Sequence, residues 1–432
     1  MDLMKELLKK AEQVEVVNLH NETTTVSFEA NQLKSSSVAQ TRGTAVRVVR
    51  DGRLGFAASS DEKAITKLAA NALESAAYGD RLILKFPTAK PAQQVRTFDQ
   101  KIVDLSISRL VEIGREILDL ILPVEPDARV NLNLTRSVQS ASLRNQTGLD
   151  IAFERSPLSF ELEIDRIVGD DVLIIFDVVG TTQWNDEYLG FARRLVEKLK
   201  MARKLTRMRS GNMPVIFSPF GVLALALPLN QGLNGKSVYK GTSPMRGKIG
   251  EKLFDEKITL IDDGTLHGRP GSAPYDDEGV PHQRNVLVEK GVLKGFIYDL
   301  RTAAQFGVES TGNAERGLFN QPEPSSTNFM IQPGKTPLKD MIASISEGIL
   351  VEGLLGLGQG NIISGAFSNP LALAFKIEKG EIVGRVKDMS IAGNVYDLLK
   401  NVEAVSQEAE WVYGSIHAPY VLLPQMNVVS KE

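Results

Sequence analysis

Histidine and carboxylate side chains are the strongest candidates for metal chemistry in this sequence, because the chain contains no cysteine. The four histidines are His20, His267, His282 and His417. No two of them are three to five residues apart, the spacing that places two ligands on one helix or loop. The pattern H-E-x-x-H of zinc peptidases is therefore absent. Disulfides, thiol nucleophiles and zinc sites with sulfur ligands are excluded as well.

The densest group of polar side chains lies in the stretch "DDGTLHGRPGSAPYDDEGVPHQ" at 262–283. One interpretation is a hard-cation site that would serve a stand-alone metal-dependent hydrolase. The other is a structured loop, because Asp next to Gly is typical of turns and the spacing fits no EF-hand. The candidate ligands of the first interpretation are Asp262, Asp263, His267, Asp276, Asp277, Glu278 and His282.

Other motifs give weaker signals. A serine nucleophile would need a turn such as G-x-S-x-G, and neither "GTSPM" nor "SGAFS" matches it, so Ser243 is expected in a turn. The glycines of "GLLGLGQG" at 353–360 have neither P-loop nor dinucleotide-binding spacing. The stretch "STGNAERG" at 310–317 places Asn313 and Arg316 in an expected exposed loop, where a ligand could bind. The residue types alone define no catalytic mechanism.

Composition points to an ordinary globular protein of more than one domain. With 432 residues the chain exceeds the roughly 250 to 300 residues at which one core stops growing. A net charge of −3 gives no overall field for a phosphate backbone, so nucleic-acid binding is not expected. No apolar run approaches the ~18 residues of a membrane span, and no signal peptide is recognisable. We therefore expect a cytoplasmic protein without a membrane partner.

Hydrophobic periodicity predicts an N-terminal α+β domain over 1–185, an antiparallel sheet with helices. A first helix at "MDLMKELLKKAEQ" would dock through Leu3, Leu7, Leu8 and Ala11. Strands are expected at 14–20, 23–30 and 44–59, the last pairing across a hairpin turn at Asp51-Gly52. Helices at 61–77 and 106–122 follow, and four alternating segments then return to strand.

A basic interdomain helix is predicted over 186–210, with Ser210-Gly211 as its C-cap. Its cations could face nucleic acid or a membrane surface, or they could form a solvated face, which the net charge favours. Residues 211–432 then predict a strand-rich mixed α/β domain, with helices at 300–307, 336–347 and 393–403. It contains two hairpins with the same Glu-Lys-Gly turn. The overall fold class is α+β with two mixed domains.

Several segments resemble the TldD/PmbA family, whose members are also described as modulators of DNA gyrase. They are "GTAVRVVRDGRLGFA" at 43–57, "GTSPMRGKIGEKL" at 241–253 and the long stretches at 276–317 and 356–394. The resemblance covers essentially the whole chain. It implies a comparison with the TldD-type zinc metallopeptidases of the family, whose zinc helix carries H-E-x-x-x-H just before G-L-x-G, with a cysteine ligand further on.

The corresponding stretch of this chain is "GVLALALPLNQGLN" at 221–234. Counting back from Gly232-Leu233-Asn234-Gly235, the two histidines fall on Ala226 and Gln231 and the glutamate on Leu227. None can replace its counterpart, because Ala and Leu have no lone pair, an amide binds zinc poorly and no carboxylate remains to polarise water. The chain therefore resembles the metal-free TldE/PmbA type.

This resemblance implies a non-catalytic subunit that has no metal or other cofactor of its own and supports a zinc-bearing TldD-type partner. The complex would be cytoplasmic, would enclose a chamber and would cleave small or unfolded peptides, and the chain alone would form a homodimer. Alternatives are the stand-alone hydrolase and a DNA- or gyrase-binding modulator that uses the basic helix. Candidate cleft or peptide-contact residues are Asn230, Thr242, Ser243, Arg246, Asp276, Asp277, His282, Asn313 and Arg316.

Overall fold

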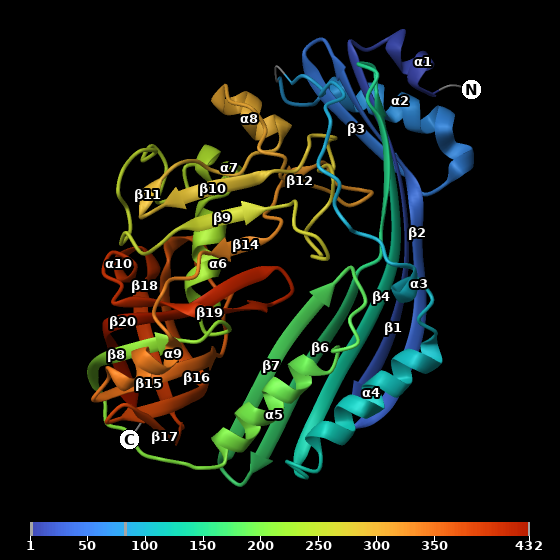
Figure 1. Ribbon diagram of the computed structural model, residues 1–432. Coiled ribbons are helices and arrows are strands. Elements are labelled where there is room, and N and C mark those ends of the chain that lie inside the picture. Colours follow the sequence, from blue (N-terminus) through green and yellow to red (C-terminus); the bar gives the residue numbers. More distant parts are fainter. Residues whose placement is uncertain (1–2, 82–83, 431–432) are drawn as a thin grey trace.

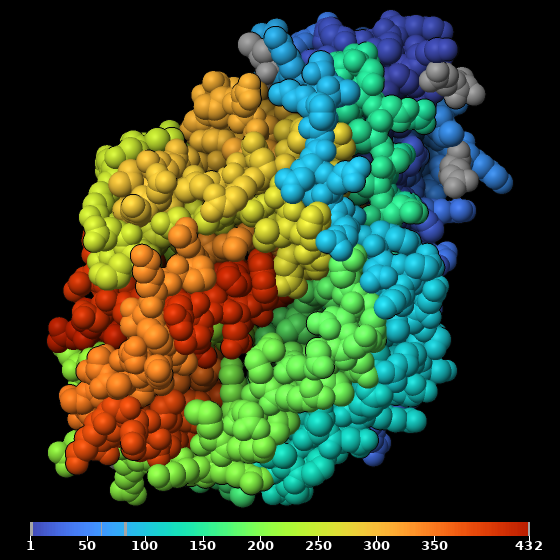
Figure 2. Space-filling view, in the orientation of Figure 1, coloured from blue at the N-terminus to red at the C-terminus, as the bar shows by residue number. Residues whose placement is uncertain are grey.

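The computed structural model describes residues 3–81 and 84–430. Two sheets dominate it, a long curved antiparallel sheet from the N-terminal half and a larger mixed sheet from the C-terminal half (Figure 1). In the space-filling view the yellow-to-red C-terminal residues pack alongside the blue-to-green N-terminal ones (Figure 2). The α+β class predicted from the sequence is confirmed. No helix in the described ranges is long and apolar enough to span a bilayer.

The N-terminal sheet has the strand order β3-β2-β1-β4-β6-β7, with β5 also paired to β4. All of its pairs are antiparallel. Its strands are β1 (Gln13–Glu29), β2 (Gln32–Arg50), β3 (Arg53–Ser59), β4 (Ala128–Asn145), β5 (Asp150–Arg155), β6 (Leu158–Val168) and β7 (Asp171–Thr181).

The helices of this half are α1 (Leu3–Leu8), α2 (Ile65–Ala76), α3 (Gln100–Val103), α4 (Ile107–Ile121) and α5 (Gly190–Ala202). A 3-10 turn over 62–64 precedes α2. In Figure 1, α1 and α2 lie at the end of the sheet near β3, while α4 and α5 lie over β4, β6 and β7. The docking helix is confirmed through Leu7, which is buried against Leu68 and Ala72, but Leu8 is exposed.

The C-terminal sheet has the order β11-β10-β9-β14-β20-β18-β16-β15-β8, with β17 beside β16 and β19 beside β20. Only β14–β20 and β15–β8 pair in parallel within this sheet as described. Its strands are β8 (Gly211–Phe217), β9 (Leu260–Asp263), β10 (Arg284–Glu289), β11 (Val292–Leu293), β14 (Phe329–Ile331), β15 (Glu347–Leu354), β16 (Ala366–Glu378), β17 (Glu381–Val386), β18 (Met389–Asn394), β19 (Ala404–Val412) and β20 (Ile416–Ser430).

The helices beside this sheet are α6 (Leu223–Gly232), α7 (Gly235–Tyr239), α8 (Leu300–Phe306), α9 (Leu338–Ala343) and α10 (Val395–Leu398), with a 3-10 turn over 362–364. Two short strands, β12 (Ala314–Glu315) and β13 (Glu323–Pro324), pair separately. The helices predicted at 300–307, 336–347 and 393–403 are confirmed as α8, α9 and α10, the last two shorter than expected.

The hairpin turns explain much of this pairing. Asp51-Gly52, Lys290-Gly291 and Lys379-Gly380 all have positive φ at both residues, the backbone of a two-residue turn that matches the twist of the strands. The three hairpins predicted at these turns are confirmed. The turn Ala30-Asn31 has the same backbone and joins β1 to β2. This turn was not predicted, because its residues are not the usual Asn-Gly type. The two strands expected at 14–20 and 23–30 form one continuous strand, β1.

The predicted helix over 186–210 is wrong in its bounds, since α5 ends at Ala202. Residues after it run beside β17, where Thr206 N–H donates to Arg385 O at 2.8 Å and Arg385 N–H to Lys204 O at 2.7 Å. Gly211 begins β8 and is not a C-cap. The backbone bonds to β17 thus replace the last two turns of the expected helix.

The predicted division into domains at 185 and 211 stays a prediction. The N-terminal sheet takes its strands from 13–181 and the C-terminal sheet from 211–430. One hydrophobic core joins them, because Leu132 and Leu162 of the first sheet share a cluster with Leu350 and Phe375 of the second. A second core surrounds α6 within the C-terminal half.

Candidate functional site

The stretch at 221–234, which we compared with a zinc helix, follows closely after the end of β8. Ser218 is fully buried and turns the chain: its N–H donates to Val351 O on β15 at 2.9 Å, and its carbonyl accepts the Val222 N–H at 2.8 Å. Its Oγ also accepts the Gly221 N–H at 3.1 Å. These bonds fix the first turn of α6 against the centre of the C-terminal sheet.

Helix α6 carries no charged residue, and seven of its ten residues are buried. Pro228 interrupts the helix ladder because it has no N–H. The Tyr396 hydroxyl reaches the same turn and lies 3.2 Å from Pro228 O and 3.1 Å from Ile363 O. Such an apolar helix fits a core position, and the prediction of a packed helix at 221–234 is confirmed.

The three positions of the zinc motif lie in different environments. Ala226 is fully buried in the core, Leu227 is half-buried and Gln231 is exposed. The methyl group of Ala226 and the isobutyl group of Leu227 offer zinc no lone pair. The side chain of Gln231 is exposed and does not share the buried environment of Ala226. Within 3–81 and 84–430, no group of three or more His, Cys, Asp or Glu side chains is placed to hold a metal ion. The residues at α6 therefore do not fit zinc.

Two cavities adjoin α6, and we call them the α6 cavities. One of about 450 Å³ lies between α6, the glycine-rich stretch 355–359 and the start of β16. The other, of about 240 Å³, reaches α5 and contains Lys198 and Glu352, whose Nζ and Oε2 are 2.7 Å apart. Leu223 and Leu227 line both cavities. Leu227, at the position that we compared with the glutamate of the motif, thus lines two cavities whose α6 side chains are all aliphatic.

A buried group of charges joins the two halves of the chain, and we call Glu15, Arg47, Glu278 and Arg316 the seam cluster. Arg47 donates to both carboxylate oxygens of Glu15, at 2.9 and 2.6 Å. Arg316 Nη2 lies 2.8 Å from Glu15 Oε1, and Arg47 Nη1 also pairs with Glu278. All four side chains are almost completely buried.

Burial alone would raise the pKa of Glu15, but Arg316 and Arg47 together hold it below its ordinary value. Burial raises the pKa of Glu278, and Asp299 and Glu15 add to this rise while Arg47 opposes it. Burial and the neighbouring Glu278 raise the pKa of Asp276 well above its usual range. The pKa of the carboxyl group is thus lowered at Glu15 and raised at Glu278 and at the neighbouring Asp276.

The candidate residues Asp276, Asp277, His282 and Asn313 do come together, around a polar cavity of about 120 Å³. Asp276 accepts the N–H groups of Glu278, Val280 and Ala314, so its oxygens serve the loop itself. The stretch that contains it is a structured loop, as the second sequence interpretation holds.

The remaining candidates of this loop are also engaged. Asn313 donates to Asp262 at 2.6 Å, and Arg316 N–H donates to Asp277 Oδ2 at 2.8 Å. His282 Nδ1 donates to the Gly312 carbonyl at 2.6 Å, and burial lowers its pKa to about 4. His267 lies apart and accepts the Arg96 N–H at 3.0 Å. These bonds build the loop and provide no support for a hydrolase.

The other candidate contacts lie around α7 and do not join this cavity directly. Thr242 and Arg246 are exposed, whereas Ser243 is buried and donates to Gly232 O at 2.6 Å. Asn230, at the end of α6, donates to Ser326 at 2.8 Å, and Ser326 lines the polar cavity. Asn230 is therefore the candidate on α6 that connects with the loop cluster.

The basic face of α5 is largely neutralised within the chain. Arg193 pairs with Glu187 at 3.2 Å, Arg194 with Glu410 at 3.5 Å and Lys198 with Glu352 at 2.7 Å. Farther along, Lys200 pairs with Glu197 at 2.7 Å. Cations that are already paired give little attraction to a phosphate backbone. This pairing gives the DNA-binding alternative little support on α5, whereas Arg203, Lys204, Arg207 and Arg209, which follow the helix, are exposed.

The fold and the apolar α6 together define a two-sheet α+β protein whose central helix carries no charged side chain. The model of the PmbA/TldA metallopeptidase C-terminal domain matches residues 210–430, and that of PmbA/TldA metallopeptidase domain 1 matches 14–76. The chain belongs to the TldD/PmbA family.

Among known proteins, an uncharacterised protein of Methanocaldococcus jannaschii is 28% identical over 98% of both chains. A metalloprotease TldD homolog of Haemophilus influenzae is 35% identical and matches 52% of this chain and 47% of its own length. The crystal structure of TldE from Thermococcus kodakarensis superposes with a TM-score of 0.90 at 29% identity and covers 99% of both chains. The chain is thus similar over its whole length to a structure of the TldE type.

Two groups of residues were not predicted from the sequence as parts of a buried cluster or a pocket. Glu15 lies on β1 and Arg47 on β2, in segments where polar and apolar residues alternate and a polar residue normally faces water. They are buried where the C-terminal half of the chain, through Glu278, contacts these strands. Trp184 and Trp411 line a further pocket. Their signal was available, because they are the only two tryptophans of the chain.

Proposed function

We propose that this chain is the non-catalytic, metal-free subunit of a TldD/TldE-type zinc metallopeptidase complex that cleaves small or unfolded peptides. The observation that carries the proposal is α6. The helix occupies the place of the zinc helix in the sequence, yet Ala226 is fully buried in the core and Gln231 is exposed. Zinc and the water that it activates would then come from a TldD-type partner.

The resemblance to a TldE crystal structure over the full chain supports this assignment. So do the aliphatic side chains of Leu223 and Leu227, which line both α6 cavities. In the complex this chain would form part of the chamber wall, with its N-terminal domain at 1–185 and its C-terminal domain at 211–432. The assembly would be cytoplasmic, and the chain alone would pair as a homodimer through a self-complementary surface.

The test compares the purified chain alone, an H-E-x-x-x-H chain of the same organism alone, and the two co-purified. Zinc is measured by mass spectrometry, stoichiometry by light scattering, and cleavage with an unfolded peptide that carries a fluorophore and a quencher. We expect stoichiometric zinc and chelator-sensitive cleavage in the complex, and neither in this chain alone. Chelator-sensitive cleavage by this chain alone would refute the proposal.

Two variants separate the proposal from a hydrolase that uses the loop at 262–283. Asp276→Ala and His282→Ala remove the candidate ligands, and Asp119→Ala on the exposed side of α4 is a matched control. If the chain alone cleaved peptide, and only the first two changes abolished cleavage while the variants stayed folded by circular dichroism, the hydrolase alternative would replace ours.

A further inference from the structure

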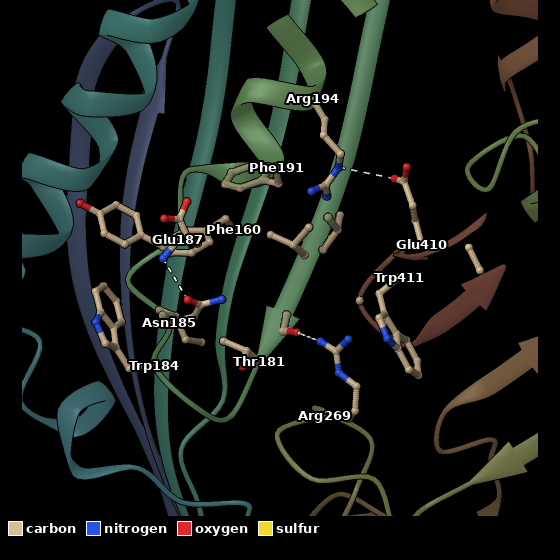
Figure 3. A pocket seen from close by; sticks show the side chains of 17 residues that line it. Phe160, Thr181, Trp184, Asn185, Glu187, Phe191, Arg194, Arg269, Glu410 and Trp411 are labelled. Carbon is tan, nitrogen blue, oxygen red and sulfur yellow. Dashed lines mark hydrogen bonds and ion pairs between the residues drawn. The ribbon is translucent and has the colours of Figure 1, made fainter. Parts of the chain in front are cut away.

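A pocket of about 480 Å³ lies between the end of the N-terminal sheet and β19 of the C-terminal sheet (Figure 3). We call it the aromatic pocket. Figure 3 shows Trp184, Phe160 and Phe191 on one side and Trp411 on the other, and Tyr188 also lines the pocket. Phe160 and Phe191 stack with ring centroids 5.6 Å apart, and Trp184 and Tyr188 lie at 5.1 Å. This volume and these rings suit a small ligand with a flat apolar group.

One cation of the pocket has no anionic partner. The Arg269 guanidinium lies over the Trp411 ring, 4.3 Å from its centroid, and donates to the Gly180 carbonyl. Figure 3 shows it at the floor of the pocket, between the two walls. No carboxylate in the described part of the chain forms an ion pair with it, and burial lowers its pKa. A half-buried arginine without a counter-ion is an attractive site for an anion.

The other charges of the pocket are already paired. Arg194 faces Glu410 across the rim at 3.5 Å, and Glu187 pairs with Arg193 at 3.2 Å. The uncompensated charge of the lining is therefore positive and belongs to Arg269.

The start of α5 adds to this positive potential. The helix has 13 residues, and Tyr188, which precedes its N-cap residue, and Phe191, its second residue, line the pocket. Its N-cap residue, Leu189, makes no side-chain capping bond. The free N–H groups and the dipole of a helix N-terminus favour a negative charge nearby. Arg269 and the start of α5 thus border the same pocket from different elements.

We propose that the aromatic pocket binds a carboxylate attached to an aromatic or large apolar group, with the carboxylate at Arg269 and the apolar group between the tryptophans. Two sources share this chemistry: the free C-terminus of a peptide that ends in such a residue, and a free aromatic acid. The pocket lies apart from the positions 226, 227 and 231 of the zinc motif, and the proposal does not depend on the metallopeptidase partnership.

Binding is measured with the full chain alone, by titration calorimetry and by quenching of its two tryptophans. The probes are a tetrapeptide that ends in phenylalanine with a free carboxylate, the same peptide as its C-terminal amide, and N-acetyl-phenylalanine. Because a charge-assisted hydrogen bond is lost, we expect the amide to bind about 10- to 100-fold more weakly than the acid. Equal affinity for acid and amide, or no binding of the acid, would overturn the proposal.

Variants locate the site. Arg269→Gln is expected to reduce affinity for the acid to that for the amide, and Arg269→Lys to restore part of it, whereas Arg207→Gln on the exposed stretch after α5 should leave it unchanged. Trp184→Leu should weaken acid and amide alike. Thermal melting verifies that each variant is folded. A folded Arg269→Gln variant with wild-type affinity would refute the proposal.

The probes also distinguish the two sources. If the tetrapeptide binds more tightly than N-acetyl-phenylalanine, the preceding residues contribute and the ligand is a peptide C-terminus. If N-acetyl-phenylalanine binds as tightly, the site recognises the terminal aromatic acid alone. Both results support the pocket chemistry, and neither requires zinc or a second chain, so failure of the proposed complex would leave this test intact.

Discussion

Asp177 on β7 provides a direct test of the electrostatics between the two sheets. Its side chain is buried, and its Oδ1 accepts the Val178 N–H at 2.8 Å. Burial raises its pKa from 3.8 to about 6, although Lys198 and Arg194 oppose the rise. The fold thus holds this carboxyl in its protonated form at a pH where the unfolded chain would ionise it.

The size of the effect follows from this pKa. When pH rises above 3.8, the unfolded state releases the proton first, so the free energy of unfolding falls until the pH passes about 6. At about 1.4 kcal/mol per pH unit, the penalty reaches about 3 kcal/mol above pH 6. Asp177→Asn keeps an acceptor for Val178 and removes the ionisation. We therefore expect the variant to be more stable than wild type by about 2 to 3 kcal/mol at neutral pH.

The assay is urea unfolding of wild type and Asp177→Asn, followed by tryptophan fluorescence and circular dichroism. We expect the advantage of the variant to grow by about 2 kcal/mol between about pH 4.5 and pH 8. Asp170→Asn is the control, because Asp170 is exposed and its pKa is lowered by Lys387, so that this variant should gain nothing as pH rises. An advantage of Asp177→Asn that is independent of pH would refute the reasoning.

Three further predictions concern the seam cluster, the packing of α4 and the titration of His282. Glu15→Gln leaves two buried arginines with an uncompensated charge and should cost about 3 to 5 kcal/mol in urea unfolding. Gly114→Ala on α4 should lower the melting temperature despite the higher helix propensity of alanine, because its Cβ would lie 2.2 Å from the Phe28 ring. His282 should titrate near its pKa of about 4 in proton NMR, so that its contribution to stability is present above pH 6.5 and lost as pH falls toward 4.

Local patterns predicted much of the fold because they depend on neighbouring residues. The period of the apolar residues placed α4 within one residue at each end, and Asp51-Gly52 fixed a hairpin. The exposed half of β2 at 32–42 was missed, since its Ser and Ala residues carry no hydrophobic alternation. The true end of α5 was missed because it depends on backbone bonds to β17, almost 180 residues later.

The residues of the candidate site also fall into those that the local sequence predicts and those that depend on distant partners. Sequence comparison with the family motif selected 226, 227 and 231, and the apolar character of α6 followed from its composition. The role of Arg316 could not be predicted, because its partner Glu15 is 301 positions away and a loop arginine usually faces water. The pairing of Arg269 with Trp411 likewise exists only where the two sheets meet.

The surroundings of Ala226 on α6 oppose the introduction of a zinc ligand at this position. Ala226 has no exposed surface and lies among Leu225, Leu229 and their core neighbours. An imidazole at that position would need about one ring of new space in a close-packed core and a partner for each nitrogen. The three exchanges alone would therefore not create a zinc site at α6. A cation without a carboxylate partner lies at a different cavity, where Arg269 borders the aromatic pocket.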